Sequence, residues 1–308
     1  LIIFINIVIL NGKMTINAFI GYVANIPITV FIPYTIGFLV LLIGSYTDFK
    51  TKEVPDWISY ALIFSGLSIR LIFSLINSEP FYFLYGLLGF GSMFLLGNIL
   101  YHTKQWGGGD AKLIMGLGST LATKPFYLQN SIMPFLLILI LTIFIIGSIY
   151  GFIWSLALIF KNPKNFKEEF LKLNSQNYKI IKILTIVVAI ILIFLSFYLT
   201  NLKFIPIIIA VLLLIYPYLF IAVKAIENLH FYRLTQVEKL VEGDWIAQDI
   251  KLNNKIVYPK RELGIEKKDI DKLIKIGVKK ALIKDGIPFI PSFLLGAIIA
   301  LIFGNPFI

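Results

Sequence analysis

The chain has 308 residues, of which 58% are hydrophobic and 15% are charged, and its formal net charge at pH 7 is +11. Such a composition lies outside the range of soluble globular proteins and predicts a polytopic membrane protein. The chain has no cysteine and only two histidines, which excludes disulfides, thiolate catalysis and metal sites built from cysteine or clustered histidine. The net positive charge fits contact with anionic membrane lipid, and it requires no nucleic-acid partner.

The N-terminal residues form an apolar run that resembles the central region of a signal peptide. No basic residue precedes this run and no small-residue cleavage site follows it, so we do not interpret it as a signal. Met14 opens a plausible alternative start. We therefore expect residues 1–27 to be an N-terminal segment that lies partly upstream of the true start.

Apolar runs long enough to cross a hydrocarbon core of about 30 Å recur along the rest of the chain. They lie near residues 28–47, 57–76, 81–101, 131–160, 180–200, 204–223 and 287–306. A shorter apolar segment, 111–123, contains two glycines and is too short to cross alone, so it is a half-helix or shares its crossing with the next run. We expect an all-α membrane protein with about seven or eight transmembrane helices.

Residues 224–286 are the soluble part of this pattern and predict a small αβ module. Two segments, 245–250 and 255–258, flank Leu-Asn-Asn and predict a hairpin. Apolar residues at near-helical spacing then end at Gly277, and a last short strand follows at 281–286. We divide the chain after its N-terminal segment into a membrane core, a cytoplasmic αβ module and a last transmembrane helix, namely 28–223, 224–286 and 287–308.

The predicted helices alternate in direction, which puts four connections on one side of the membrane: 48–56, 102–112, 161–179 and 224–286. With the adjoining helix ends, that side holds all but four of the 28 lysine and arginine residues. The positive-inside rule therefore predicts that it faces the cytoplasm, and the short connections alone point the same way. This orientation counts 111–123 as one crossing.

Two aspartates lie at apolar runs on the predicted cytoplasmic side, Asp48 after the first run and Asp110 after the third. An ionisable residue at a membrane boundary indicates a functional site, because desolvating a carboxylate is costly. Two neighbouring carboxyl groups that share one proton supply both the base and the acid that peptide hydrolysis needs. Such a pair titrates as a unit, so the sequence does not assign the two roles.

Three glycines, Gly107, Gly108 and Gly109, precede Asp110. We expect them to let the backbone approach an extended substrate closely and to adopt positive φ. The next helix is expected to begin at Asp110. A simpler interpretation is that Asp110 is an ordinary N-cap and that Asp48, beside two lysines, is a solvated interface residue.

Taken together, the segments around the two aspartates resemble the prepilin peptidase family of GxGD aspartyl proteases. The resemblance covers roughly residues 28–125, and segments 242–245 and 286–293 are similar to the C-terminal region of archaeal prepilin and preflagellin peptidases. The motifs that carry it are Asp48-Phe49-Lys50-Thr51-Lys52-Glu53-Val54-Pro55-Asp56-Trp57 and Gly107-Gly108-Gly109-Asp110-Ala111-Lys112-Leu113.

The resemblance implies that Asp48 and Asp110 are the catalytic pair of an aspartic endopeptidase and that Gly107, Gly108 and Gly109 shape its loop. It implies cleavage of the short basic leader of type IV pilin-like or archaellin precursors at the cytoplasmic face of the cell membrane. No metal or cofactor is expected. The cysteine-rich zinc module of bacterial members has no counterpart here, which argues against N-methyltransferase activity.

Five further residues are interpreted individually. Lys112 steers a carboxylate or the substrate backbone, or it snorkels to the interface. Glu53 and Asp56 are solvated, and as a further hypothesis they attract the basic leader. Arg70 pairs with a buried carboxylate or links helices, and Trp106 is assigned to the interfacial aromatic belt.

Three alternative functions stay open. A presenilin-like or signal-peptide-peptidase-like intramembrane protease shares the GxGD motif, but here Thr47 precedes Asp48 and no Pro-Ala-Leu occurs. A transporter predicts carboxylates near mid-bilayer and a repeated half, and the sequence has neither. A membrane scaffold that presents residues 224–286 to a partner would leave both aspartates replaceable.

Overall fold

The structure, a computed structural model, describes residues 27–125, 133–176, 178–199, 202, 204–252, 255–260 and 264–303. The predicted N-terminal segment 1–27 lies outside these residues except for Pro27. The described residues divide into two compact units. One runs to Gly151 and resumes at Gly286, and the other is Phe152–Asp285.

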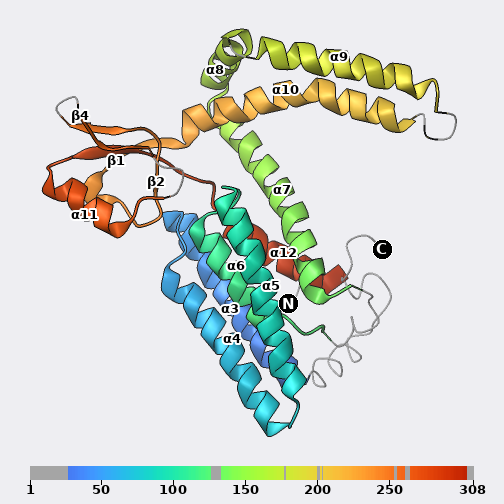
Figure 1. Ribbon diagram of the computed structural model, residues 1–308, viewed down its shortest axis with the longest axis vertical. Coiled ribbons are helices and arrows are strands. Elements are labelled where there is room, and N and C mark those ends of the chain that lie inside the picture. The colour runs from blue at the N-terminus through green and yellow to red at the C-terminus, as the bar shows by residue number, and fades with distance from the viewer. Residues whose placement is uncertain are drawn as a thin grey trace. The chain divides into compact units, whose positions relative to one another are not determined.

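Most of the chain is helical, as predicted (Figure 1). Among the described residues, six helices are long and apolar enough to cross a membrane: α3 (Ile28–Thr51), α4 (Asp56–Ile76), α5 (Pro80–His102), α7 (Phe135–Lys161), α9 (Lys179–Ser196) and α10 (Phe204–His230). Two further predicted segments form shorter apolar helices, α6 (Gly108–Thr120) and α12 (Ile290–Phe303). The chain is therefore a multi-pass membrane protein.

Helix α6 contacts α3, α4 and α5 in the first unit. Gly97 of α5 lies against Ala111 and Gly89 lies against Gly118, so α5 and α6 run antiparallel. A Cβ atom added at Gly118 would lie 2.4 Å from the carbonyl oxygen of Gly89. Small residues thus let the two backbones meet directly, as in other membrane helix pairs.

The same contacts bring four helix ends together. Gly44 of α3 lies near Leu113, and Gly37 lies near Leu121, so α3 also runs antiparallel to α6. Helix α4 runs parallel to α6, because Leu62 packs on Gly116 and Gly66 lies against Ser119. The ends of α3 and α5 and the starts of α4 and α6 therefore lie at one end of the bundle.

Arg70 is fully buried in α4 and lies at the opposite end of the bundle. Its Nε donates to the carbonyl oxygen of Ser119 at 2.6 Å, and its Nη2 donates to that of Thr120 at 2.8 Å. The guanidinium also lies 4.8 Å from the ring centroid of Tyr82. Arg70 therefore closes the C-terminal end of α6, which is the structural, helix-linking role among its two interpretations.

The second unit contains α9 and α10, which pack on each other, and α8 (Pro163–Gln176). Residues 161–179 were predicted only as a connection between two membrane helices, and most of them form α8. It forms because Phe166, Phe170 and Leu173 recur at helical spacing and are half-buried. This face packs against α10.

The predicted αβ module is present in the second unit. Strands β1 (Tyr232–Gln236), β5 (Lys280–Lys284) and β2 (Trp245–Ile246) form an antiparallel sheet with β5 in the centre. The predicted hairpin is confirmed only in part: β4 (Lys255–Tyr258) pairs with β3 (Ile250–Leu252), whereas Trp245 and Ile246, which were predicted to belong to the hairpin, pair with β5. Residues 253–254 lie outside the described range. The predicted helix is α11 (Lys267–Lys275), and a 3-10 turn, η2 (Val237–Lys239), follows β1. Gly277 has φ +83°, which explains why a glycine ends the α11 segment.

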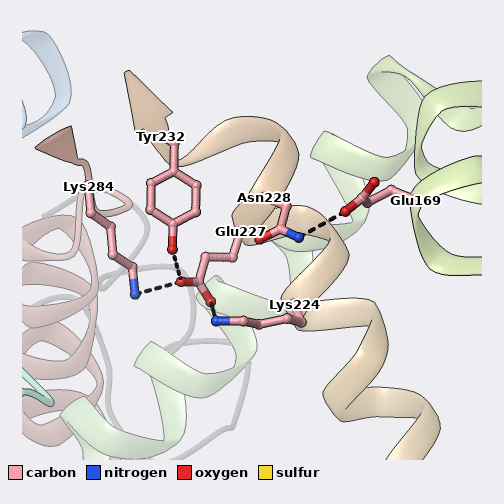
Figure 2. A network of polar contacts seen from close by, with 6 residues as sticks. All are labelled: Glu169, Lys224, Glu227, Asn228, Tyr232 and Lys284. Atoms are coloured by element: carbon pink, nitrogen blue, oxygen red, sulfur yellow. Dashed lines mark hydrogen bonds and ion pairs between the residues drawn. The ribbon is translucent and has the colours of Figure 1, made fainter. Parts of the chain in front are cut away.

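A polar network joins α10 to both sides of its own unit (Figure 2). The Glu227 carboxylate accepts hydrogen bonds from Lys224 at 3.0 Å, Lys284 at 2.9 Å and the Tyr232 hydroxyl at 2.9 Å. The neighbouring Asn228 donates to Glu169 of α8 at 2.9 Å. One turn of α10 therefore holds β1, β5 and α8.

Candidate active site

Asp48 lies in the last turn of α3, three residues before the helix ends at Thr51. It was expected just beyond the helix as a solvated or catalytic residue, but its side chain faces the bundle and is only 5% exposed. Its Oδ2 accepts a hydrogen bond of 2.8 Å from the backbone N–H of Ile290, the first residue of α12. A buried carboxylate requires such a partner.

Asp110 lies in the first turn of α6, which begins at Gly108 and not at Asp110 as expected. Asp110 is not the N-cap, which is Gly107, but as the third helical residue it still caps the start of the helix, as the simpler interpretation expected of its carboxylate. Its Oδ2 accepts a hydrogen bond of 3.2 Å from the backbone N–H of Gly107. Asp110 and Asp48 lie within electrostatic range of each other, so the structure brings the two predicted carboxylates to one end of the bundle.

The glycine loop differs from expectation in its backbone. Gly107 has φ −69°, and no glycine in 107–109 has positive φ. What requires a small residue is close approach. A Cβ at Gly109 would lie 3.2 Å from Cβ of Val54, just before α4, and one at Gly107 would lie 3.4 Å from Oδ2 of Asp110. The loop is therefore pressed against the Asp48 motif.

Lys112, Asp56 and Glu53 lie on the exposed side of this end. Lys112 Nζ is 2.7 Å from both carboxylate oxygens of Asp56, and it lies over the ring of Tyr60 at 5.6 Å from the centroid. This pair joins α6 to the start of α4. Glu53 is exposed in the connection between α3 and α4.

Trp106 is not an interfacial belt residue. Its side chain is 4% exposed, and its ring centroid lies 4.9 Å from that of Phe293, 5.7 Å from that of Phe144 and 6.0 Å from that of Phe289. The aromatic cluster fixes the start of α12, which carries the N–H that binds Asp48. Sequence reasoning missed this role, although the similarity of segment 286–293 to archaeal peptidases was a signal.

Tyr150 of α7 is a second group that sequence reasoning missed. Its hydroxyl is buried and lies within electrostatic range of Asp48. The sequence offers no signal for it, since a single tyrosine in an apolar run is most simply a packing residue. Among the described residues, no three His, Cys, Asp or Glu side chains cluster as a metal site would require.

Chemically, this end of the bundle presents two carboxyl groups from different helices, Asp48 bound by main-chain N–H at the start of α12 and Asp110 bound by the N–H of Gly107. Close carboxyl groups do not both ionise readily, so such a pair holds one proton and one charge. The charged carboxylate of such a pair can activate a water molecule, and the protonated carboxyl group can donate its proton to a carbonyl oxygen. The chain contains no cysteine, so a thiolate is not available as the nucleophile.

Comparison with known proteins gives an independent finding. Residues 35–156 match the type IV leader peptidase family. A preflagellin peptidase of Methanococcus voltae is 32% identical over 155 residues, which are 46% of this chain and 65% of the relative. A prepilin peptidase EppA of Methanothermobacter thermautotrophicus is 27% identical over 194 residues, 60% of this chain and 49% of the relative.

A preflagellin peptidase of Methanocaldococcus jannaschii is 34% identical over 90 residues, 29% of this chain and 38% of the relative. The chain therefore spans less than two thirds of the length of each of these relatives. No solved structure matches it. The segment that matches the type IV leader peptidase family, residues 35–156, contains both aspartates and the glycine loop.

Proposed function

We propose that the chain is a membrane aspartic endopeptidase that removes the short basic leader of type IV pilin-like or archaellin precursors. The observation that carries the proposal is the approach of Asp48 and Asp110 at one end of the bundle, inside the segment that matches a leader peptidase family. The names of the similar relatives, preflagellin and prepilin peptidases, support the substrate class.

In this proposal the charged aspartate takes a proton from a water molecule while the neutral one donates its proton to the scissile carbonyl oxygen. The water oxygen bonds to the carbonyl carbon. The pair then returns one proton to the leaving amine and takes one back from the gem-diol as the C–N bond breaks. Gly107, Gly108 and Gly109 have no side chains, so an extended substrate backbone can approach the loop closely.

We assign this site to the cytoplasmic face. The support is the distribution of lysine and arginine, nearly all of which lie in the connections and helix ends on the predicted side. Glu53 and Asp56 lie exposed at the same end of the bundle as the aspartates, and in this proposal they attract the basic leader. Lys112 orients Asp56 through their ion pair.

The direct test is cleavage of a pilin-like or archaellin precursor co-expressed with the wild type, Asp48→Asn or Asp110→Asn. Each single variant should lose cleavage by at least about a thousandfold, as expected when a group that transfers a proton is removed. Asp271→Asn, on the exposed side of α11, is the matched control and should cleave normally. Wild-type cleavage by either dyad variant, with expression intact, would rule out the proposed pair.

A smaller test addresses the leader. Replacing both Glu53 and Asp56 by lysine should raise KM for a precursor with a basic leader several-fold, because the local charge changes sign. A precursor whose leader lysines are replaced by serine should lose this difference. Unchanged KM for the basic leader would remove these two residues from the proposal.

A further inference from the structure

The start of α12 supplies the donor to Asp48 although the two lie 242 residues apart in the sequence. Ile290 is fully buried, and its side chain packs against Gly44, one turn before Asp48. On the other side, Phe289 and Phe293 pack against Trp106. The N–H of Ile290 is therefore fixed on two sides, and its direction toward Asp48 is set by packing.

The two carboxylates are held differently. The hydrogen bond from Ile290 to Asp48 is 2.8 Å long and buried, whereas the one from Gly107 to Asp110 is 3.2 Å long and only part-buried. Hydrogen bonds in which the acceptor is charged are on average shorter and stronger than those between neutral groups.

Resting on the proposed function, we infer that the main-chain N–H of Ile290 positions Asp48 and holds it as the charged member of the pair. Asp48 is then the base and Asp110 is the acid. The titratable groups that face Asp48 are Asp110 of α6 and Tyr150 of α7. Helix α12 adds only its backbone, since residues 286–303 contain no titratable side chain.

With these roles the reaction balances. The Asp48 carboxylate takes a proton from water, the water oxygen bonds to the carbonyl carbon, and the carbonyl oxygen takes the proton of Asp110. Asp48 then gives its proton to the peptide nitrogen as the C–N bond breaks. A hydroxyl of the former carbonyl returns a proton to Asp110, so both residues regain their starting states.

Ile290→Pro tests the role of the N–H, because proline lacks that donor and is favoured at the first position of a helix. Its matched control is Ile290→Ala, which also loses the buried side chain but keeps the N–H. The measurement is kcat and KM for precursor cleavage across the pH range. We expect Ile290→Pro to lower kcat at least tenfold beyond Ile290→Ala, with the same KM as that control.

The pH profile separates positioning from general damage. If Asp48 carries the charge, loss of its donor makes the pair gain its second proton at higher pH, so the acidic limb of the profile moves up by about one unit. Ile290→Ala should move neither limb. A shift of the basic limb instead would mean that Asp110 carries the charge, and unmoved limbs would mean that the N–H does not act on Asp48. Either result overturns the inference.

A second measurement needs neither proline nor cleavage. In the infrared spectrum of the purified full chain at neutral pH, the C=O band of a protonated, buried carboxyl should disappear in Asp110→Asn and persist in Asp48→Asn. The opposite pattern overturns the inference. Because this readout is independent of turnover, failure of the proposed peptidase activity and failure of the role assignment give different results.

Discussion

The bundle α3–α6 and the pair α9–α10 are both built from largely apolar helices, but they pack in different ways. The bundle uses glycines at its helix contacts, whereas no glycine occurs between Gly151 and Gly243. The bundle also buries a carboxylate and a guanidinium, while α9 and α10 carry their charges near their ends and leave most large side chains exposed to their surroundings.

The difference teaches that apolar content alone specifies residence in the membrane, and that small residues specify which helices meet. Lipid tails are as apolar as leucine, so helix association in a bilayer depends on close packing and polar contacts. Charged side chains can be buried where close backbone contacts supply them with hydrogen-bond partners. The candidate site lies in the closely packed region for this reason.

The largest expected effect is at the closest backbone contact. Gly118→Ala places a Cβ 2.4 Å from the carbonyl oxygen of Gly89, so α5 and α6 must separate. We expect a loss of about 3 kcal/mol or more in unfolding free energy, measured by thermal unfolding in detergent. Gly91→Ala in α5 is the matched control, because nothing lies within 4 Å of its added Cβ. Equal losses would contradict the contrast between the two regions.

The next effect concerns the buried guanidinium. Arg70→Met removes the donors to Ser119 and Thr120 and should destabilise the protein by about 2–4 kcal/mol, because the carbonyl groups at the end of α6 lose their partners. Arg70→Lys should lose less, since it keeps the charge but not the forked geometry. The same unfolding assay measures both. An unchanged unfolding free energy in Arg70→Met would show that the carbonyl groups at this end of α6 do not need the guanidinium as a partner.

A smaller effect is expected in the second unit. Glu227→Gln weakens the bonds from Lys224 and Lys284 (Figure 2), and we expect a loss of about 1 kcal/mol, because both lysines are partly exposed. Hydrogen exchange of β1 and β5 amides should report it as faster opening. Glu168→Gln, exposed on α8, is the control. If exchange does not change, the network does not hold the strands.

The smallest effect is a pH dependence within the αβ module. Burial raises the pKa of Asp244 above its usual value, despite a hydrogen bond from the N–H of Val241. The folded module therefore binds this proton more tightly than the unfolded chain does. Its stability is highest below the unfolded pKa and falls as the pH rises through the interval up to the folded pKa.

Asp244→Asn should flatten that dependence. The measurement is the exchange protection of the Ile265 amide, which donates to the carbonyl oxygen of Asp244, corrected for its intrinsic rate at each pH. Asp271→Asn should keep the wild-type slope. A protection that rises with pH in the wild type would have the wrong sign for a carboxyl group whose pKa is raised by folding.

Much of the fold could be predicted from the sequence. Apolar runs predicted the six long helices to within a few residues at most ends, and period and turn signals predicted β4, α11 and β5, whereas the strand expected at 245–250 is divided between β2 and β3. The segment 161–179 was predicted only as a connection, and three half-buried apolar residues give it a helical face. Helix ends were less certain, and α3 continues through Asp48 because its last turn is packed.

The two aspartates of the candidate site could be predicted from the sequence, but the groups that contact and position them could not. Asp48 and Asp110 are local motifs, whereas the contact between Asp48 and Ile290 depends on tertiary packing that no spacing rule reports. Positive φ was expected for the glycine loop because glycine permits it, yet close approach to Val54 is what the position requires. Trp106 was misplaced because buried and interfacial tryptophans have the same sequence signature.

The long-range contact to α12 also bears on when the protein becomes competent during synthesis. Helices α3 to α6 leave the ribosome and enter the membrane well before residues 286–303 are made, so a nascent chain has both aspartates but lacks the donor to Asp48. On the proposed function, proteolysis begins only once the last helix has inserted. A chain that stops before Gly286 would then contain helices α3 to α6 and both aspartates, but its site would be inactive because the N–H of Ile290 is missing.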